Sequence, residues 1–382
     1  MNITFGDKKF QKIVNDDRKM VIQNQYFPQS RPHPGKTLAE KLAEMGMGPK
    51  EFAVRTGKPE KTISAVLNGK SAITADMAVQ FEKVTLIPAH FWMNSQQNFD
   101  VFVAREKNRK IIEDAIDWAK LFPYADMAQK GWIQMKTSMD DKASELLAFF
   151  GISNHTAWEN LYLNQHLKVA YRISLAHTKE PHAISAWLRQ GELQAAKLSA
   201  NDYSEKIFRD TLPEIKKIMA THPDDYYIQL QNSCLRAGVK VVYTPCIKKA
   251  PISGCSRWLG DTPLIQLSGR YKRNDIFWFT FFHEVGHILL HGKKEIFLEE
   301  VAYTGKEKEK EEEADRFSAN YLLTQAEERE IIDAAPLNAT KVCAFAKKFH
   351  THPACIIGRL QHKGLIPFSL RTDLIKKIEI AP

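Results

Sequence analysis

The sequence predicts an α+β protein that is predominantly helical: an all-helical N-terminal region, a helical connector, and a C-terminal region with a small β-sheet. Apolar residues recur at helical spacing over most of the chain, while a valine-rich segment at 239–243 and TPLIQL at 262–267 are the strand candidates. Prolines, glycines and shifts in pattern divide the chain into an N-terminal extension at 1–30 and further segments at 31–100, 101–235 and 236–382.

The composition is that of a globular protein. Hydrophobic residues make up 44% and aromatic residues 10% of the 382 residues, enough for two or three domains with their own cores. We find no run of about eighteen apolar residues and no apolar signal segment in MNITFGDKKF, so we expect a cytoplasmic protein without a membrane span. The five cysteines show no CxxC spacing and are expected to be reduced thiols.

Three short helices are expected between residues 36 and 69. Gly46 to Pro49 breaks the first, the second ends at Gly57, and the third has Pro59 at a favoured first position and stops at Asn68 and Gly69. The apolar positions that space the first helix are Leu38, Leu42 and Met45.

A short helix, a turn with glycine and another short helix also fit a helix-turn-helix, although spacing alone fits a helical bundle equally well. The last helix would then lie in a major groove of DNA, with lysines near phosphates and Thr62 or Ser64 near base edges. The net charge of +9 permits nucleic-acid binding without proving it. The candidate DNA-contacting residues are Lys58, Glu60, Lys61, Thr62, Ser64 and Lys70.

The segment FWFTFFHEVGHILLH at 277–291 predicts a buried helix with an HExxH pattern, preceded by Asn274 and Asp275. His283 and His287 stand one turn apart, so they can bind one zinc ion, and Glu284 can take a proton from a metal-bound water. Ordinary core histidines are the alternative. Burying two histidines and a carboxylate on so apolar a helix is costly unless a partner satisfies them, which favours a metal site. His291, one turn further, is more typical of a helix end than of a ligand.

A hydrolytic metal site needs a third protein ligand. The run KEKEKEEEAD is by itself typical of a solvated helix face, but the apolar residues that follow predict a helix entering the core. One of Glu311, Glu312 or Glu313 is therefore expected at the metal. Glu311 and Asp315 share a helical face, so Asp315 can accept a hydrogen bond from the outer nitrogen of His283 and fix its tautomer.

The two strand candidates, with turns expected at Gly254 and at Gly260-Asp261, predict a small sheet against which the HExxH helix packs. An edge strand of such a sheet can pair with an extended substrate backbone. Arg257 and Tyr303 are candidate oxyanion stabilisers, although an exposed arginine and a core tyrosine are the more typical interpretations.

The stretch HEVGHILLH, followed by the ExEAD-x-F-x-A pattern at 311–319, resembles the ImmA/IrrE family of metallopeptidases. The sequence departs from the family at 322–325, which reads Leu-Leu-Thr-Gln where the family often has Leu-Leu-x-Pro. HPACIIGRLQHKGLIP also resembles a stretch of such proteins fused to helix-turn-helix domains; we expect its histidines to be at the surface. The resemblance implies zinc held by His283, His287 and Glu311, with Glu284 as general base.

The segment from Pro34 to Trp92, with ISAVLNGKSAIT and the closing IPAHFW, resembles Cro/XRE-type helix-turn-helix proteins and specifically the HigA branch of antitoxins. This resemblance implies an operator DNA partner, a homodimer, and a cognate protein, toxin or repressor, encoded nearby. Because Glu51 and Glu60 flank the DNA-reading helix, we expect salt-sensitive binding that depends on dimerisation.

The sequence therefore predicts a DNA-binding antitoxin and transcriptional regulator of a toxin–antitoxin or mobile-element locus, with a zinc-dependent endopeptidase domain that cleaves a specific protein partner. The alternative is a non-proteolytic antitoxin and autorepressor whose metal domain only senses or docks the toxin. The spacing of the carboxylates leaves the choice between Glu311 and Glu313 as third ligand open.

Overall fold

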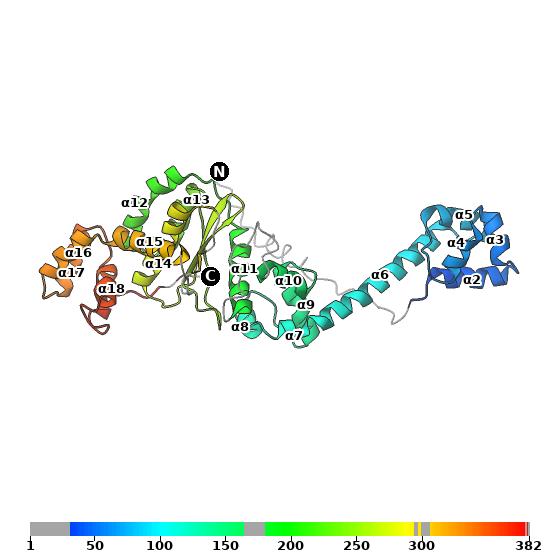
Figure 1. The fold of residues 1–382 in the computed structure, drawn as a ribbon, viewed down its shortest axis with the longest axis horizontal. Helices are drawn as coiled ribbons and strands as arrows, with labels where there is room; N and C mark the ends of the chain where they lie inside the picture. Colours follow the sequence, from blue (N-terminus) through cyan, green and yellow to red (C-terminus); the bar gives the residue numbers. More distant parts are fainter. Residues whose placement is uncertain (1–30, 164–179, 294–296, 299–305, 379, 381–382) are drawn as a thin grey trace, which may run out of the picture. The chain divides into compact units, whose positions relative to one another are not determined.

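The computed structural model describes residues 31–163, 180–293, 297–298, 306–378 and 380 (Figure 1). The chain divides into two compact units, Met1–Lys110 and Ile111–Pro382. The extension predicted at 1–30 lies outside the described residues. No helix among the described residues is long and apolar enough to cross a membrane.

The described part of the first unit, residues 31–110, has helices as its regular elements, as the sequence predicted. Its core consists of side chains that each helix turns inward, among them Leu38, Phe52, Ile63, Phe81 and Trp92, all fully buried. The helices are α2 (Pro34–Glu44), α3 (Pro49–Thr56), α4 (Glu60–Leu67), α5 (Ala75–Thr85) and α6 (Ala89–Asp114), which runs past the division between the units.

Local chemistry sets the ends of these short helices. Gly57 takes a left-handed conformation with φ 64° and ends α3, as expected of a C-terminal glycine. Two details differ from the prediction. Pro59 is the residue before α4 rather than its first residue, which leaves its extended backbone outside the helix. Met45 follows the end of α2 and is 37% exposed, so Met47 fills the core instead.

The second unit begins with helices that bury an aromatic cluster. Trp118, Phe150, Trp158 and Trp187 lie in this core, which continues into Cys255 of the sheet. The predicted connector at 101–235 is therefore not a separate body beyond residue 110, because its helices pack on the sheet domain. These helices are α7 (Ile116–Ala119), α8 (Tyr124–Gln129), α9 (Met139–Phe150), α10 (His155–Tyr162), α11 (Pro181–Ala195), α12 (Glu205–Thr221) and α13 (Tyr226–Arg236).

A mixed sheet in the order β1-β3-β2-β4 supports the C-terminal region. Strand β1 (Lys240–Tyr243) pairs parallel with β3 (Thr262–Leu267), and both coincide with the predicted strands. Strand β2 (Gly254–Leu259) pairs antiparallel with β3 and with the short β4 (Phe297–Leu298). The turn predicted at Gly254 was wrong: this residue starts β2, a strand whose buried Ser256 and Arg257 are residue types that are mostly found at the surface.

Helix α14 (Asn274–His291) lies against β2 and β3, and α15 (Lys306–Leu322) packs beside it (Figure 1). Asn274 is the first residue of α14 rather than its cap, which is Arg273. The chain then continues through α16 (Gln325–Asp333), α17 (Ala339–Lys348), α18 (Pro353–His362) and the 3-10 turn η2 (Thr372–Leu374).

The Leu-Leu-Thr-Gln sequence between α15 and α16 has a local explanation. Thr324 caps α16: its hydroxyl accepts from the Glu327 amide, and the Glu327 carboxylate accepts from the Thr324 amide. Gln325 occupies the first helical position, the one that proline favours. A capping box therefore starts this helix without the proline.

Candidate metal centre

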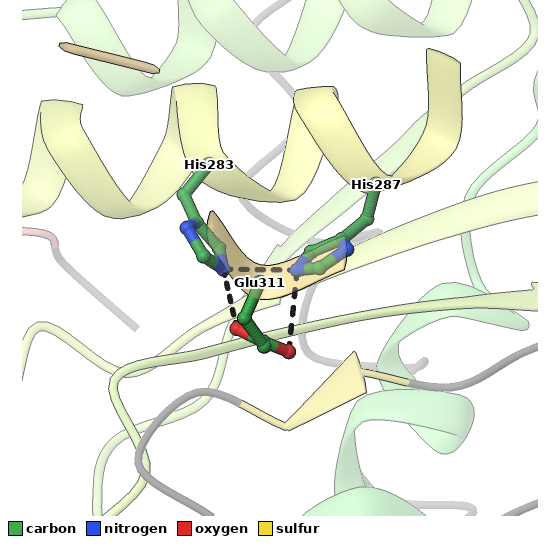
Figure 2. A group of neighbouring side chains, drawn as sticks. All are labelled: His283, His287 and Glu311. Carbon is green, nitrogen blue, oxygen red and sulfur yellow. Dashed lines mark hydrogen bonds and ion pairs between the residues drawn. The ribbon is translucent and has the colours of Figure 1, made fainter. Parts of the chain in front are cut away.

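His283 and His287 project from one face of α14, and their Nε2 atoms lie 2.9 Å apart (Figure 2). Both rings are almost fully buried, each with 2% of the residue exposed. The helical spacing of four residues produces this convergence because such residues are neighbours on a helix surface.

Glu311 reaches the same point from α15 (Figure 2). Its Oε2 lies 3.2 Å from Nε2 of His283, and its Oε1 lies 3.6 Å from Nε2 of His287. Within the described residues, these three side chains form a group whose potential ligand atoms all lie within 4.8 Å of one another. The structure thus brings Glu311, rather than Glu312 or Glu313, to the pair of histidines.

Close packing of α14 on α15 makes this approach possible. A Cβ on Gly286 would lie 3.2 Å from the Ala314 backbone and 3.3 Å from Phe317, so glycine allows the helices to come together. The Ser318 hydroxyl donates to the Phe279 carbonyl at 2.8 Å and ties the two helices together one turn before His283. Sequence reasoning missed both contacts, although the glycine within the HEVGH motif was a visible signal.

The electrostatics of the site favour ligand-competent forms at neutral pH. Burial, the largest influence, lowers the pKa of His287 to about 4, so its imidazole is neutral. Burial raises the pKa of Glu311, but its interactions with His283 and His287 outweigh that effect and bring the pKa down to about 2. A neutral imidazole and an ionised carboxylate are the forms that bind a metal ion.

A second layer of side chains holds the histidines from behind. Oδ1 of Asp315 lies 2.9 Å from Nδ1 of His283, the contact that the sequence predicted for this residue. His287 has a longer chain of contacts: its Nδ1 lies 3.0 Å from Nδ1 of His291, whose Nε2 lies 3.0 Å from Oε2 of Glu313. Sequence reasoning treated His291 as a helix-end residue and missed this connection.

Glu284 is fully buried beside His283. Its side chain packs against β2 where that strand has a glycine: a Cβ on Gly254 would lie 2.7 Å from Oε1 of Glu284 and 2.5 Å from Cγ2 of Thr280. The sheet therefore leaves space for the Glu284 carboxylate only because residue 254 has no side chain.

The donor set fits a divalent transition metal ion. Two imidazole nitrogens and one carboxylate oxygen converge from two helices, which is a ligand set of hydrolytic metal sites. Oε1 of Glu311 is buried and receives no well-formed hydrogen bond from the described residues, so a polar atom directed at the site lacks a protein donor. A positive ion between the three groups would satisfy it.

Three other sequence expectations have different outcomes. Arg257 is 1% exposed and donates to the Leu188 carbonyl at 2.6 Å, on the face of β2 opposite Gly254, so it is a buried structural residue and not an oxyanion stabiliser. Tyr303 lies outside the described residues. His352, expected at the surface, is buried, and its Nδ1 accepts from the Ala354 amide, because the ring caps α18.

The candidate DNA-contacting residues gather on and around α4. Glu60 and Lys61 are exposed, Thr62 and Ser64 are half-buried, and the opposite face of the helix packs into the core. Lys70 is exposed shortly after the helix. The remaining candidate, Lys58, precedes α4 and forms an ion pair with Asp76 at the start of α5.

The fold and the site define a chain with a helix-turn-helix region followed by a metallopeptidase-type domain of the HExxH class. The family model described as the IrrE N-terminal-like domain matches residues 234–350, the segment that contains β1–β3, α14 and α15. This match covers the whole candidate metal centre.

The N-terminal region is 30% identical over 77 residues to an uncharacterised HTH-type transcriptional regulator of Escherichia coli strain K12, covering 20% of this chain and 82% of the relative. The chain belongs to the helix-turn-helix family of transcriptional regulators and carries an IrrE-like domain in its C-terminal region.

Two solved structures also match the N-terminal region. An addiction module antidote protein of the HigA family from Coxiella burnetii is 37% identical, covering 22% of this chain and 95% of that chain, with a TM-score of 0.21. The Pseudomonas aeruginosa antitoxin HigA with the higBA promoter is 30% identical, covering 22% of this chain and 94% of that chain, with a TM-score of 0.21.

Proposed function

We propose that the chain is a DNA-binding antitoxin-type regulator whose C-terminal domain is a zinc-dependent endopeptidase that cleaves one specific protein partner, a repressor or a toxin, in the cytoplasm. The observation that carries the peptidase part is the convergence of His283, His287 and Glu311 beside the buried Glu284. Nothing in ordinary core packing requires two imidazoles and a carboxylate to meet at one point.

The proposed roles follow from where each group lies. His283, His287 and Glu311 hold the zinc ion, which when bound polarises a scissile carbonyl and acidifies a water molecule. Glu284 accepts the proton of the attacking water and delivers it to the leaving amine. Asp315 keeps the proton of His283 on Nδ1, so that its Nε2 lone pair faces the ion.

The sheet supplies a place for the substrate backbone. Among the described residues, β4 is the sheet edge next to β2, the strand that packs against Glu284. An extended peptide would add to the sheet at that edge, a recognised mode of binding peptide backbones. This arrangement favours a polypeptide substrate over a small molecule.

The proposed DNA-binding role rests on α4 and on the family of the N-terminal region. Lys61 and Lys70 would contact phosphates, while Thr62 and Ser64 would approach base edges in a major groove of the operator. A homodimer would place two copies of α4 one helical turn of DNA apart, so that both bind one operator and their binding free energies combine. Glu60 on the same face weakens non-specific binding to the phosphates.

Coexpression with the protein encoded beside this gene tests the proposal. We expect that partner to be cleaved by the wild-type chain and by Glu312→Gln, the matched control on the exposed face of α15. Glu284→Gln should retain the metal but cut about 10²–10⁴-fold more slowly, because the proton acceptor is gone. Cleavage by Glu284→Gln at the wild-type rate contradicts the peptidase proposal. A partner that is neutralised equally by both chains without being cut supports the non-proteolytic antitoxin and autorepressor.

A further inference from the structure

A second concave surface lies away from the metal ligands, between α12, the end of α15 and α17. It encloses a cavity of about 950 Å³, which we call the α12–α17 groove. The groove is lined by lysines and by the half-buried ring of Tyr321, ten residues after Glu311 on α15. At 1.5 Å per residue, Tyr321 lies about 15 Å along the helix axis from that ligand.

The charge of the groove is strongly one-sided. Four lysines line it, whereas Glu327 is the one acidic residue in its lining. The carboxylate of Glu327 already accepts from the Thr324 amide at 2.7 Å and caps α16. One lysine, Lys348, forms an ion pair with Glu330. The other three have no ion-pair partner among the described residues: Lys216, Lys217 and Lys347.

The aromatic rings of the groove distinguish between classes of anionic partner. Tyr321 stacks on Phe282 at 4.7 Å and on Phe317 at 5.8 Å, so its faces are occupied by the protein itself. Phe349 stacks on Phe345 at 5.7 Å, and the Lys348 ammonium lies over the Phe349 ring, 5.2 Å from its centroid. Proteins that bind single-stranded nucleic acid use open aromatic faces as stacking platforms, and these rings offer none. Their edges instead provide apolar contact for side chains.

We propose that the α12–α17 groove binds an acidic segment of a protein partner, with carboxylates paired to Lys216, Lys217 and Lys347 and an apolar side chain against Tyr321. Clusters of basic side chains are a recurring means of recognising acidic motifs in protein partners. The groove contains none of the proposed metal ligands, so this interaction holds whether or not the C-terminal domain cuts its partner.

The thiol of Cys343 can report whether the α12–α17 groove is occupied. Cys343 is an exposed free cysteine in the lining, whereas Cys234, Cys255 and Cys355 are buried. Cys246 is half-buried and is replaced by serine in every chain of the experiment. The experiment measures the rate at which a maleimide modifies Cys343 in the full-length chain, at physiological salt. The probe is a twelve-residue peptide of alternating glutamate and leucine. Peptide at about ten times its dissociation constant leaves about a tenth of the sites free, so modification should slow about tenfold.

Two sets of variants complete the test. In Lys216→Gln/Lys217→Gln/Lys347→Gln, the peptide should no longer slow the modification of Cys343. The matched control Lys248→Gln/Lys249→Gln/Lys272→Gln removes three exposed lysines of the same unit and should keep the full protection. Each rate is compared with the rate of the same variant without peptide, which cancels any change in thiol reactivity.

Three results would overturn the proposal. The first is a peptide that does not protect Cys343 in the wild-type chain. The second is equal protection by the same peptide with glutamine in place of glutamate, which would assign binding to leucine alone. The third is equal protection by a DNA duplex at matched phosphate and carboxylate concentrations, which would make the groove a nucleic-acid surface.

Discussion

Helices α14 and α4 carry the two candidate functional surfaces of this chain, and they differ in what surrounds them. The candidate metal ligands of α14 are almost fully buried and meet partners on α15 at defined distances, whereas the candidate residues of α4 point largely to solvent. A buried polar group must form its hydrogen bonds or bind an ion inside the protein, so its neighbours indicate its role. An exposed side chain carries no such constraint. The structure therefore defines the candidate metal centre residue by residue and the candidate DNA surface only as a helix face.

The largest expected effect is the loss of a metal ligand. Glu311→Gln replaces an ionised carboxylate with a neutral amide, so the affinity for zinc should fall more than about 100-fold, beyond what the loss of an outer partner costs. Glu312→Gln should leave the affinity unchanged because that side chain is exposed and lies 3.9 Å from Lys308 and from Arg316 rather than at the histidines. Competition with a zinc-chelating dye measures both. Equal zinc affinities in the two variants would contradict the assignment of the buried Glu311, rather than the exposed Glu312, as a metal ligand.

A smaller effect is expected when the space beside Glu284 is filled. The methyl group of Gly254→Ala would collide with Glu284 and Thr280, so we expect about a 100-fold loss of proteolytic rate from the displaced base, with metal content retained. The overpacking should also cost about 1–3 kcal/mol of unfolding free energy. Adding Thr280→Ser removes the Cγ2 contact and should restore stability but not rate. A double variant with full activity would contradict the role of this glycine.

The next largest effect is expected from the side chains that contact His287 on the side away from the candidate metal site. Glu313→Gln should weaken zinc binding about tenfold, the lower range for an outer partner, because it breaks the chain from Glu313 through His291 to His287. His291→Asn keeps an acceptor near Nδ1 of His287 and should fall between the wild type and His291→Leu. The bound Co²⁺ spectrum should shift in the same order, a readout that folding alone would not move. An unchanged zinc affinity in His291→Leu would contradict the role of His291 as the group that links Glu313 to His287.

Acid should lower the unfolding free energy through two buried histidines that contact the N-terminal part of α14. His222 and His352 contact its Trp278 and Asn274, and burial lowers the pKa of each to about 4 from 6.5. Between those values the unfolded chain binds protons that the folded chain does not, so the unfolding free energy should fall as pH drops from about 6.5 to about 4 and stay flat above. Denaturant titrations of the wild type and His222→Gln test this, since the variant should show a shallower decline.

The smallest effects are expected at α4. Replacing Lys61 by alanine should lower the slope of log affinity against log salt by about one and weaken binding to all DNA sequences alike. Thr62→Ala should instead relax the preference for one base pair. Lys107→Ala, an exposed lysine of α6, is the control and should change neither. If Lys107→Ala has the same effect as Lys61→Ala, the binding depends on overall charge and not on this helix face.

Much of the architecture was predictable from the sequence because its signals are local. HExxH spacing, a glycine after a helix and a short apolar segment preceded by turn residues identified α14, the end of α3 and β3 without knowledge of distant contacts. Strand β2 was missed because its buried positions include the polar residues Ser256 and Arg257, and His352 was misplaced because its burial arises from Asn274, far away in sequence. The choice of Glu311 over Glu313 likewise required the crossing of α14 and α15, which spacing within one helix does not determine.

The most direct test of the metal centre is the metal content of the purified full-length chain beside that of His283→Ala. We predict about one zinc ion per wild-type chain and none in the variant, with both chains folded by circular dichroism. A folded wild-type chain that binds no zinc, even when supplied with it, would contradict the account and leave His283, His287 and Glu311 as a hydrogen-bonded cluster in a DNA-binding regulator.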